Sequence, residues 1–326
     1  MRIACALVTY NRVRLLAKAV EAVLAQTRPL DRVFVIDNAS TDGTREFLES
    51  QSDTRLTAIH TSQNLGGAGG FRLAVDLAIA NGYDAVWLFD DDGLPGPHSL
   101  ETLLSALENH GLAMANSLVV SEKDPTVLAF GLIKETPGYR GPSISTVAEA
   151  KAEASGGLLF DMANPFNGTL LRCSTVGAAG SIRNEMFIWG DEIEFMRRLI
   201  RQGHRVATVL EARHQHPEPK TTTVQTRFGA TRVPSKGREI YFYRNRAFNA
   251  YQHFGLNLCL REMARTVLRN LARGATGEAL MTVVWGLDGV FDLYALKPSR
   301  GALNAAWRTE FDSALAQSRM QQGSVR

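Results

Sequence analysis

Four short apolar runs, separated by segments with helical spacing of apolar residues, constrain the fold of this chain more than any other feature. The runs predict four buried strands, at Ile3–Thr9, Val33–Asp37, Leu56–Thr61 and Ala85–Asp90. Three helices are predicted between them, at Arg12–Gln26, Gly43–Ser50 and Gly69–Ala80. Because strand–helix alternation of this kind is typical of a parallel sheet with right-handed crossovers, we expect an α/β fold.

Polar residues gather where each predicted strand ends. Thr9 and Asn11 end the first strand, Asp37 ends the second, Asn64 follows the third and Asp90 ends the fourth. In parallel sheets, ligands bind at the carboxyl ends of the strands. The sequence therefore predicts one binding site at this edge of the sheet.

Three consecutive carboxylates, Asp90, Asp91 and Asp92, close the fourth predicted strand. They repel one another and resist removal from water unless a cation is present. In an extended segment Asp90 and Asp92 point to the same side, where they could hold Mg²⁺ or Mn²⁺ together with phosphate oxygens. The alternative is a solvated acidic turn, which the predicted parallel sheet disfavours.

A glycine-rich segment, Asn64–Gly70, lies between the third predicted strand and the helix that follows. Glycines such as Gly66 and Gly67 would allow backbone N–H groups to approach a diphosphate at the helix N-terminus. The spacing matches neither the Rossmann fingerprint nor the P-loop, so a merely flexible turn fits the segment equally well.

The second half of the chain is less regular. Residues 121–165 contain several prolines and glycines and predict a long excursion, of the kind that serves as a functional loop or lid. A strand is predicted at Phe166–Leu171, an aromatic strand at Met186–Gly190 and a helix at Asp191–Gly203. From about Leu260 onward we expect mostly helix.

Two further groups of polar residues belong to this half. Asp191 and Glu192 begin the predicted helix, where they complement the helix dipole or could take a proton from a hydroxyl group. His214 and His216 share one face of an extended segment, so either could become a metal ligand beside the carboxylates.

The composition narrows the class of protein. Of the 326 residues 45% are hydrophobic and 21% charged, which excludes collagenous, low-complexity and wholly disordered chains. A net charge of +3 is too small to indicate a nucleic-acid-binding protein. The charge is unevenly distributed, however, with 21 basic and 26 acidic residues in 1–220 and 15 basic and 7 acidic residues in 221–326. The basic C-terminal third favours an anionic partner, such as a membrane surface.

The predicted C-terminal helices carry much of this charge. Arg261, Arg265, Arg269 and Arg273 recur every four residues beside the apolar stripe Met263–Leu271. The pattern fits a helix lying on a membrane surface, or equally a helix packed on the rest of the protein. The apolar run at Ala279–Leu296 is interrupted by acidic residues, so we do not expect a spanning helix.

The cysteines and the N-terminus bear on the compartment. The three cysteines are widely spaced and form neither a ligand pattern nor a disulfide framework, which favours a reducing compartment. The first apolar run is too short to be the core of an export signal. We therefore expect a cytoplasmic protein, with peripheral contact at the inner membrane face through the basic helices.

Taken together, these motifs resemble inverting family 2 glycosyltransferases with the GT-A fold, over roughly residues 3–250. The segments 8–12 and 35–44 and the acidic triplet resemble that family's nucleotide-sugar half. Several stretches look closest to the galactofuranosyltransferases that start the mycobacterial galactan: Asn64–Phe71, Trp87–Gly93, Phe166–Gly168, Phe187–Ile200, His216-Pro217 and Tyr243–Arg246.

The resemblance implies a domain organisation. A GT-A domain would cover residues 1–250, with a mostly parallel, Rossmann-like sheet flanked by helices. Its nucleotide-sugar half would span about 1–120 and its acceptor half about 121–250. Residues 251–326 would form a C-terminal helical region.

On the donor side, the resemblance implies a nucleotide-sugar site that includes Thr9, Asn11, Asn64, Gly66, Gly67 and Asp91. Asp37 would contact the uracil base. Asp90 and Asp92 would serve the metal and the diphosphate, with Mn²⁺ or Mg²⁺ as the cofactor. His216 would be the third metal ligand, while His214, one strand repeat away, stays an alternative.

On the acceptor side, the family's acidic pair falls on Asp191 and Glu192. The second member is the usual base, but the family has aspartate where this chain has Glu192, so the choice between the two stays open. Trp189 would form an apolar platform for a sugar ring, and Asn167 would lie on the acceptor side.

The expected reaction is metal-dependent, inverting transfer of galactofuranose from UDP-galactofuranose to a hydroxyl of a glycan or a polyprenyl-diphosphate-linked acceptor. Within the same class, the alternative is a rhamnosyltransferase that uses dTDP-rhamnose. From other classes, a nucleotidyltransferase also uses paired aspartates on a parallel sheet, although the basic glycine-rich loop of such enzymes is not found near the N-terminus. A non-catalytic binding protein would leave the acidic residues and histidines unexplained.

Overall fold

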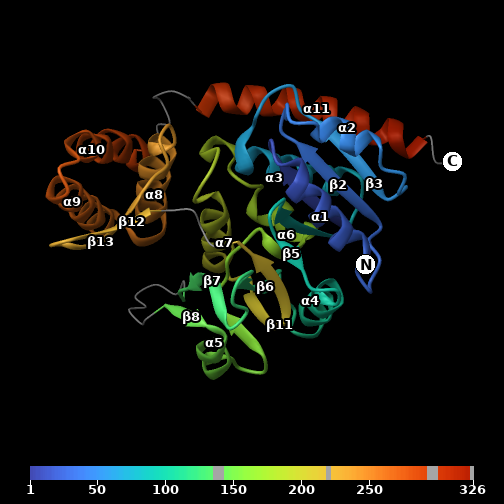
Figure 1. Cartoon of the computed structure of the whole chain (residues 1–326), viewed down its shortest axis with the longest axis horizontal. Coiled ribbons are helices and arrows are strands. Elements are labelled where there is room, and N and C mark those ends of the chain that lie inside the picture. The colour runs from blue at the N-terminus through green and yellow to red at the C-terminus, as the bar shows by residue number, and fades with distance from the viewer. Residues whose placement is uncertain (135–142, 218–221, 292–299, 324–326) are drawn as a thin grey trace.

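The computed structural model describes residues 1–134, 143–217, 222–291 and 300–323 (Figure 1). Four parallel strands form its N-terminal half, in the order β3–β2–β1–β4. They are β1 (Ile3–Thr9), β2 (Arg32–Asp37), β3 (Leu56–His60) and β4 (Ala85–Asp90). The four strands predicted from the apolar runs are therefore confirmed, and their carboxyl ends meet at one edge.

The same sheet continues past β4 with strands from the second half of the chain. Next come β10 (Asn167–Arg172), β6 (Met114–Ser121), β11 (Val206–His216) and β5 (Leu94–Pro95). β10 is antiparallel to β4 and β6, β11 is parallel to β6, and β5 is antiparallel to β11. The last residues of β11 thus lie on the same sheet as the acidic triplet that follows β4.

Helices cover both faces of the sheet, as the fold class predicts. One face packs against α1 (Val13–Leu24) and α4 (Ser99–Asn109), and the other against α3 (Gly66–Ala80), α6 (Cys173–Ala179) and α7 (Asp191–Arg201). The alternation along β1 shows why: Cys5 and Leu7 lie in the first core, and Ala6 and Val8 in the second. The short helix α2 (Thr44–Glu49) lies between β2 and β3.

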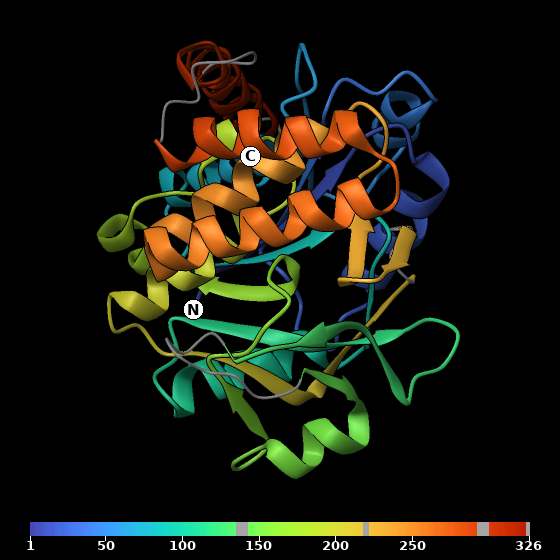
Figure 2. The same cartoon turned by 90° about the vertical axis from the view of Figure 1, so that its left-hand side faces the viewer.

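The C-terminal part forms two separate layers (Figures 1 and 2). Helices α8 (Glu239–Phe254), α9 (Leu256–Ala272) and α10 (Thr276–Val290) pack together beside the hairpin of β12 (Thr222–Thr226) and β13 (Gly229–Val233). Helix α11 (Arg300–Gly323) lies apart from these three helices, along the top of the view in Figure 1, and packs on α3 and β3. None of the described helices is long and apolar enough to cross a membrane.

Helix α11 covers the edge of the sheet. The side chain of Gln317 accepts a hydrogen bond from the His60 backbone N–H at 3.2 Å, and Gln321 donates to the carbonyl of Ala58 at 3.1 Å. Edge strands expose unpaired backbone groups that invite pairing with other chains. The glutamines satisfy part of that edge.

Two expectations for the second half were wrong. The excursion at 121–165 contains β7 (Val127–Leu132), β8 (Ile144–Thr146), α5 (Val147–Glu153) and β9 (Leu158–Phe160), and residues 135–142 lie outside the described part. These elements share a small apolar core of their own, which the prolines and glycines concealed. The segment 186–190 is not a strand: a 3₁₀ turn at Asn184–Met186 is followed by a tight turn up to α7.

Candidate active site at the carboxyl edge of the sheet

The acidic triplet is bound to residues at the end of β1. The hydroxyl of Thr9 donates to Asp91 Oδ2 at 2.6 Å. The guanidinium of Arg12 lies 3.0 Å from Asp91 Oδ1 and 2.8 Å from Asp92 Oδ2. Arg12 thus offsets part of the charge of two carboxylates. The sequence analysis did not identify this role for Arg12.

The crowding of the three carboxylates disfavours the ionised form of the third one, Asp90. Removal from water, together with the charges of Asp92 and Asp91, raises the pKa of Asp90 to about 8. A divalent cation beside the three carboxylates would lower that pKa by stabilising the ionised form. The electrostatics of the triplet therefore suit a cation-binding site.

His216 completes the cluster from β11. Its Nε2 lies 3.1 Å from Asp92 Oδ1, and its Nδ1 lies 2.6 Å from the carbonyl of Pro217. A backbone carbonyl on Nδ1 fixes the ring so that Nε2 faces the carboxylate, which is how metal-binding histidines are commonly oriented. Burial opposes the charged ring, but the hydrogen bond with Asp92 outweighs it and raises the pKa of His216.

His214 lies two residues earlier on β11 and has different surroundings. Its ring is fully buried, stacks on Phe89 at 5.8 Å, and has no hydrogen-bond partner for either nitrogen within the described residues. A Cβ on Gly93 would lie 2.0 Å from its Nε2, so the ring fills the space left by that glycine. Burial lowers the pKa of His214 to about 3, and the ring is neutral. The geometry therefore brings His216, and not His214, to the carboxylates.

The side chains of Asp90, Asp92 and His216 are suitable ligands for a hard divalent cation, although they do not converge on one point. Carboxylate oxygens and an imidazole nitrogen are ligands that Mn²⁺ accepts, and carboxylates suit Mg²⁺. Among the described residues, no three His, Cys, Asp or Glu side chains form a ready-made metal site. The guanidinium of Arg12 contacts one oxygen of Asp91 and one of Asp92.

The ends of β1 and β2 are joined by polar contacts. Asp37 pairs with Thr9 in the sheet, and its carboxylate accepts from the Ser40 N–H at 2.9 Å and contacts His60 Nδ1 at 2.8 Å. Burial opposes its ionisation, but these hydrogen bonds outweigh burial and lower the pKa of Asp37. Asn11, with φ +54°, accepts from the Thr41 N–H at 2.7 Å. The carboxylate of Asp37 is thereby held at the strand end.

The glycine-rich segment is the first turn of α3 and not a flexible turn. Asn64 accepts a hydrogen bond from the Gly66 N–H at 2.8 Å. Gly66 has φ +71°, and a Cβ there would lie 2.1 Å from the carbonyl oxygen of Phe187. Gly67 differs, because a Cβ there would meet nothing within 4 Å. Gly66 therefore permits close approach of the 187 turn, while Gly67 faces open space.

Side chains of α8 hold the turn at residues 186–190 in place through hydrogen bonds. The amide group of Asn245 donates to the carbonyls of Met186, Ile188 and Trp189, at 2.8, 3.0 and 2.9 Å. Asn249 donates to the Gly190 carbonyl at 2.8 Å. Three residues of the turn have positive φ, at +64° for Phe187, +63° for Trp189 and +96° for Gly190. The aromatic run has the composition of a strand, but these hydrogen bonds from a distant helix bend it into a turn.

The turn places the acidic pair at the start of α7. Asp191 is 4% exposed, and burial, the charge of Glu192 and a hydrogen bond with Glu192 raise its pKa well above the ordinary range. Asp90 contributes to that shift, so the pair faces the triplet. Glu192 is partly exposed and accepts from the Gly190 N–H at 2.8 Å. The two carboxyl groups are thus inequivalent, because Asp191 is buried and Glu192 is partly exposed.

Of the two residues expected on the acceptor side, Asn167 lies next to the acidic triplet and Trp189 lies just before the acidic pair. Asn167 pairs with Phe89, next to Asp90, and its side-chain oxygen is buried with no partner within the described residues. Trp189 lies in the held turn, with its ring edge-on to Phe242 at 6.1 Å and the Arg238 guanidinium 5.7 Å from its centre.

Sequence comparison identifies the family. Residues 5–143 match the model described as glycosyl transferase family 2. Over 252 residues the chain is 38% identical to galactofuranosyltransferase GlfT1 of Mycolicibacterium smegmatis, covering 76% of this chain and 82% of that protein. The chain is a family 2 glycosyltransferase. A nucleotidyltransferase or a non-catalytic binding protein is therefore not the right class.

Further comparisons agree with this assignment. The glycosyltransferase is also 38% identical to galactofuranosyltransferase GlfT1 of Mycobacterium tuberculosis, over 247 residues that cover 74% of this chain and 79% of that protein. Residues 1–349 of S. aureus TarS superpose with a TM-score of 0.54 at 13% identity, covering 99% of this chain and 92% of that one. At that identity the superposition shows the fold alone. The expected GT-A fold is confirmed.

Proposed function

We propose that this glycosyltransferase moves galactofuranose from UDP-galactofuranose, with inversion, to a hydroxyl of a glycan or polyprenyl-diphosphate-linked acceptor. The observation that carries the donor assignment is the 38% identity to two galactofuranosyltransferases over about three quarters of the chain. The matched stretch is long enough to include the triplet, the turn and His216. Transfer from dTDP-rhamnose is the competing outcome of the test below.

In this proposal the donor lies across the ends of β1, β2 and β4. Asp37 contacts the base, Thr9 and Asn11 line the nucleotide side, and Asp91 lies near the diphosphate. Asn64, Gly66 and Gly67 frame the start of α3, where Gly67 leaves open space beside a helix N-terminus. The positive end of that helix favours the negatively charged leaving group.

Asp90, Asp92 and His216 would hold Mn²⁺ or Mg²⁺, which offsets the charge that develops on the leaving diphosphate. The 3.1 Å contact between His216 and Asp92 brings two of the three ligands together. Burial and the charges of Asp92 and Asp91 raise the pKa of Asp90, and a bound divalent cation would favour its ionised form.

Glu192 is the base that takes the proton from the acceptor hydroxyl. Asp191 is 4% exposed, and burial and the neighbouring Glu192 raise its pKa, which favours a role as hydrogen-bond donor to Glu192 over a role as the group that receives the substrate's proton. Glu192 is accessible and is oriented by the Gly190 N–H. Trp189 and Asn167 would contact the acceptor.

Contact with a membrane would bring the enzyme to a lipid-linked acceptor. The outer faces of α9 and α10 expose large apolar side chains, with Leu280 and Phe291 each 65% exposed. Arg261 and Arg265 are exposed on α9 beside them. An apolar face bordered by arginines is typical of helices that lie in the interface of an anionic membrane.

A panel of nucleotide sugars tests the function. The protein is incubated with UDP-galactofuranose, UDP-galactopyranose and dTDP-rhamnose, with Mn²⁺ and with EDTA, and release of nucleoside diphosphate is followed with and without acceptor. We expect acceptor-dependent release with UDP-galactofuranose that stops in EDTA. Release with dTDP-rhamnose alone would refute the donor, and full activity in EDTA would refute the metal.

The choice of base is tested by a matched pair of variants. Glu192→Gln should lower kcat by roughly 10²–10⁴-fold because the proton acceptor is lost. Asp191→Asn keeps a hydrogen-bond donor toward Glu192, so its kcat should fall by about tenfold or less. The reverse order of effects would make Asp191 the base.

A further inference from the structure

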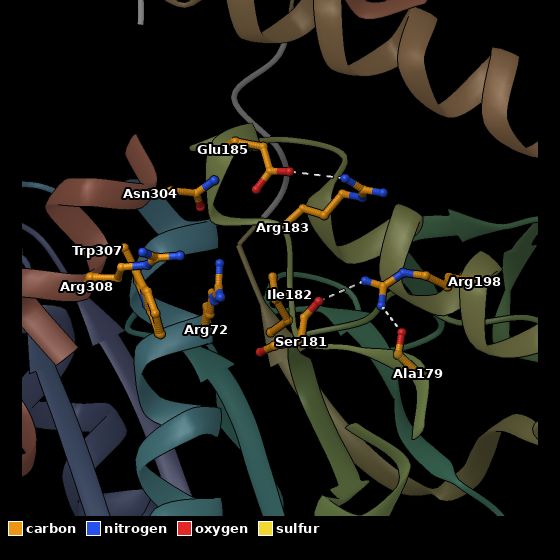
Figure 3. A pocket seen from close by; sticks show the side chains of 10 residues that line it. All are labelled: Arg72, Ala179, Ser181, Ile182, Arg183, Glu185, Arg198, Asn304, Trp307 and Arg308. Carbon is orange, nitrogen blue, oxygen red and sulfur yellow. Dashed lines mark hydrogen bonds and ion pairs between the residues drawn. The ribbon is translucent and has the colours of Figure 1, made fainter. Parts of the chain in front are cut away.

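A polar cavity of about 380 Å³, separate from the candidate active site, lies between α3, α7, α11 and the loop that follows α6 (Figure 3). None of the donor, metal or acceptor residues above lines it. Its charged lining consists of four arginines and one glutamate: Arg72, Arg183, Arg198, Arg308 and Glu185. The volume is sufficient for a small ligand.

Two of the four arginines are already used within the protein. Arg198 pairs with Glu194 at 2.9 Å and donates to the carbonyls of the loop after α6. Arg183 lies 3.1 Å from Glu185. Glu185, the one acidic residue of the lining, also lies 3.6 Å from Arg300, and Glu194 pairs with Arg198 and lies 3.3 Å from Arg183. The charges of Arg183 and Arg198 are therefore offset within the protein.

The other two arginines meet less acidic charge. The guanidinium of Arg308, an exposed residue of α11, makes no hydrogen bond or ion pair with any residue that the structure describes. The Arg72 guanidinium lies 3.8 Å from the centre of the Trp307 ring, contacts Asp76 at 3.4 Å through Nε and donates from Nη1 to the side-chain oxygen of Asn184, which leaves Nη2 for a ligand. Figure 3 shows both guanidinium groups directed into the space between α3 and α11.

The indole of Trp307 supplies a third donor. The side chain lines the cavity and is 9% exposed, yet its N–H has no acceptor among the described residues. A buried donor without a partner costs free energy, so such groups normally meet a ligand or water. Two guanidinium groups and an N–H around one cavity call for an acceptor that carries negative charge.

We propose that this cavity binds a small phosphate-bearing anion, held by Arg72, Arg308 and the Trp307 N–H. Guanidinium groups match phosphate oxygens in bidentate geometry, which favours phosphate over a single carboxylate. The phosphate belongs either to a free phosphorylated compound or to a phospholipid headgroup. The site stands apart from the transfer reaction and does not depend on the proposed donor.

Calorimetry with inorganic pyrophosphate, in EDTA so that no metal bridges it to the triplet, tests the site. We expect binding that Arg308→Gln and Arg72→Gln weaken by about tenfold or more, and Trp307→Phe by about threefold. Arg319→Gln, an exposed arginine of α11 outside the cavity, is the matched control and should bind like the wild type. Thermal unfolding of each variant verifies that it is folded.

Absence of binding by the wild type, or binding that Arg308→Gln and Trp307→Phe leave unchanged, would overturn the proposal. So would an equal loss in Arg319→Gln, which would indicate attraction by overall charge. Vesicles of phosphatidic acid in phosphatidylcholine distinguish the two sources. Displacement of pyrophosphate by these vesicles, and not by phosphatidylcholine alone, assigns the site to a headgroup, whereas no displacement assigns it to a free phosphorylated compound.

Discussion

The amide of Asn245 should determine the shape of the turn that presents Trp189 and the acidic pair. Asn245→Ala removes a buried group that donates to three carbonyls, at 2.8, 3.0 and 2.9 Å. The amide has two hydrogens, so one N–H is shared between two carbonyls. At a net value of about 1 kcal/mol for each N–H, the free energy of unfolding should fall by roughly 2 kcal/mol. For a protein of this size that corresponds to a Tm lowered by about 3 °C.

The catalytic effect should be larger than the stability effect. The turn has three positive φ angles in a row of four residues and relies on α8 to keep them. Displacement of the base by even 1 Å can reduce the rate about 10²-fold, so we expect kcat to fall by that order while the KM for the donor changes little. Steady-state transfer kinetics and thermal unfolding measure the two effects.

Two further variants test whether the turn depends on the Asn245 amide. Asn245→Asp keeps the shape of the side chain but sets carboxylate oxygens against the three carbonyls, so it should be more damaging than Asn245→Ala. Asn257→Ala, at an exposed position of α9, is the control and should match the wild type. If Asn245→Asp proved as stable and as active as the wild type, the turn would not depend on this amide.

Three other predictions concern the remaining parts of the molecule. Asp92→Ala should nearly abolish transfer with little change in Tm, because the residue lies at a strand end and not in the core; near wild-type activity in that variant would misplace the metal. Gly66→Ala should lower the Tm because its Cβ would meet Phe187, whereas Gly67→Ala should keep the Tm and weaken donor binding only; equal Tm values would contradict the model of the first turn. Sedimentation with anionic liposomes should be strong at low salt, weak at high salt and reduced by Leu280→Glu, and protein that stays in the supernatant at low salt would refute the membrane contact.

The sequence predicted the N-terminal half of the fold well because local patterns decide it. A fully buried strand such as β4 reads as a continuous apolar run, and Asp90 marks its end without any tertiary information. The position of His216 near Asp92 also followed from the family interval. Its preference over His214 required the structure, because only the fold shows that the space beside Gly93 is filled by the His214 ring.

The turn at 186–190 could not be predicted by the same means. Its run of apolar and aromatic residues has the composition of a strand, and strand propensity is easily overridden by tertiary contacts. The overriding contacts come from Asn245 and Asn249, more than fifty residues away on α8. The tyrosine–arginine–asparagine stretch at 243–246 carried the only signal, and it did not say which backbone the asparagine holds.

These observations bear on the expected division of the chain at residue 250. That boundary falls inside α8, a helix whose side chains both bind the turn at 186–190 and pack on α9 and α10. Asn245 and Asn249 hold the turn from one side, while Gly66 lets the start of α3 meet it from the other. Glu192, the proposed base, is thereby positioned both by α8 and by the first turn of α3. A change in how α8 packs would be felt at Glu192 without any change in the residues that bind the donor.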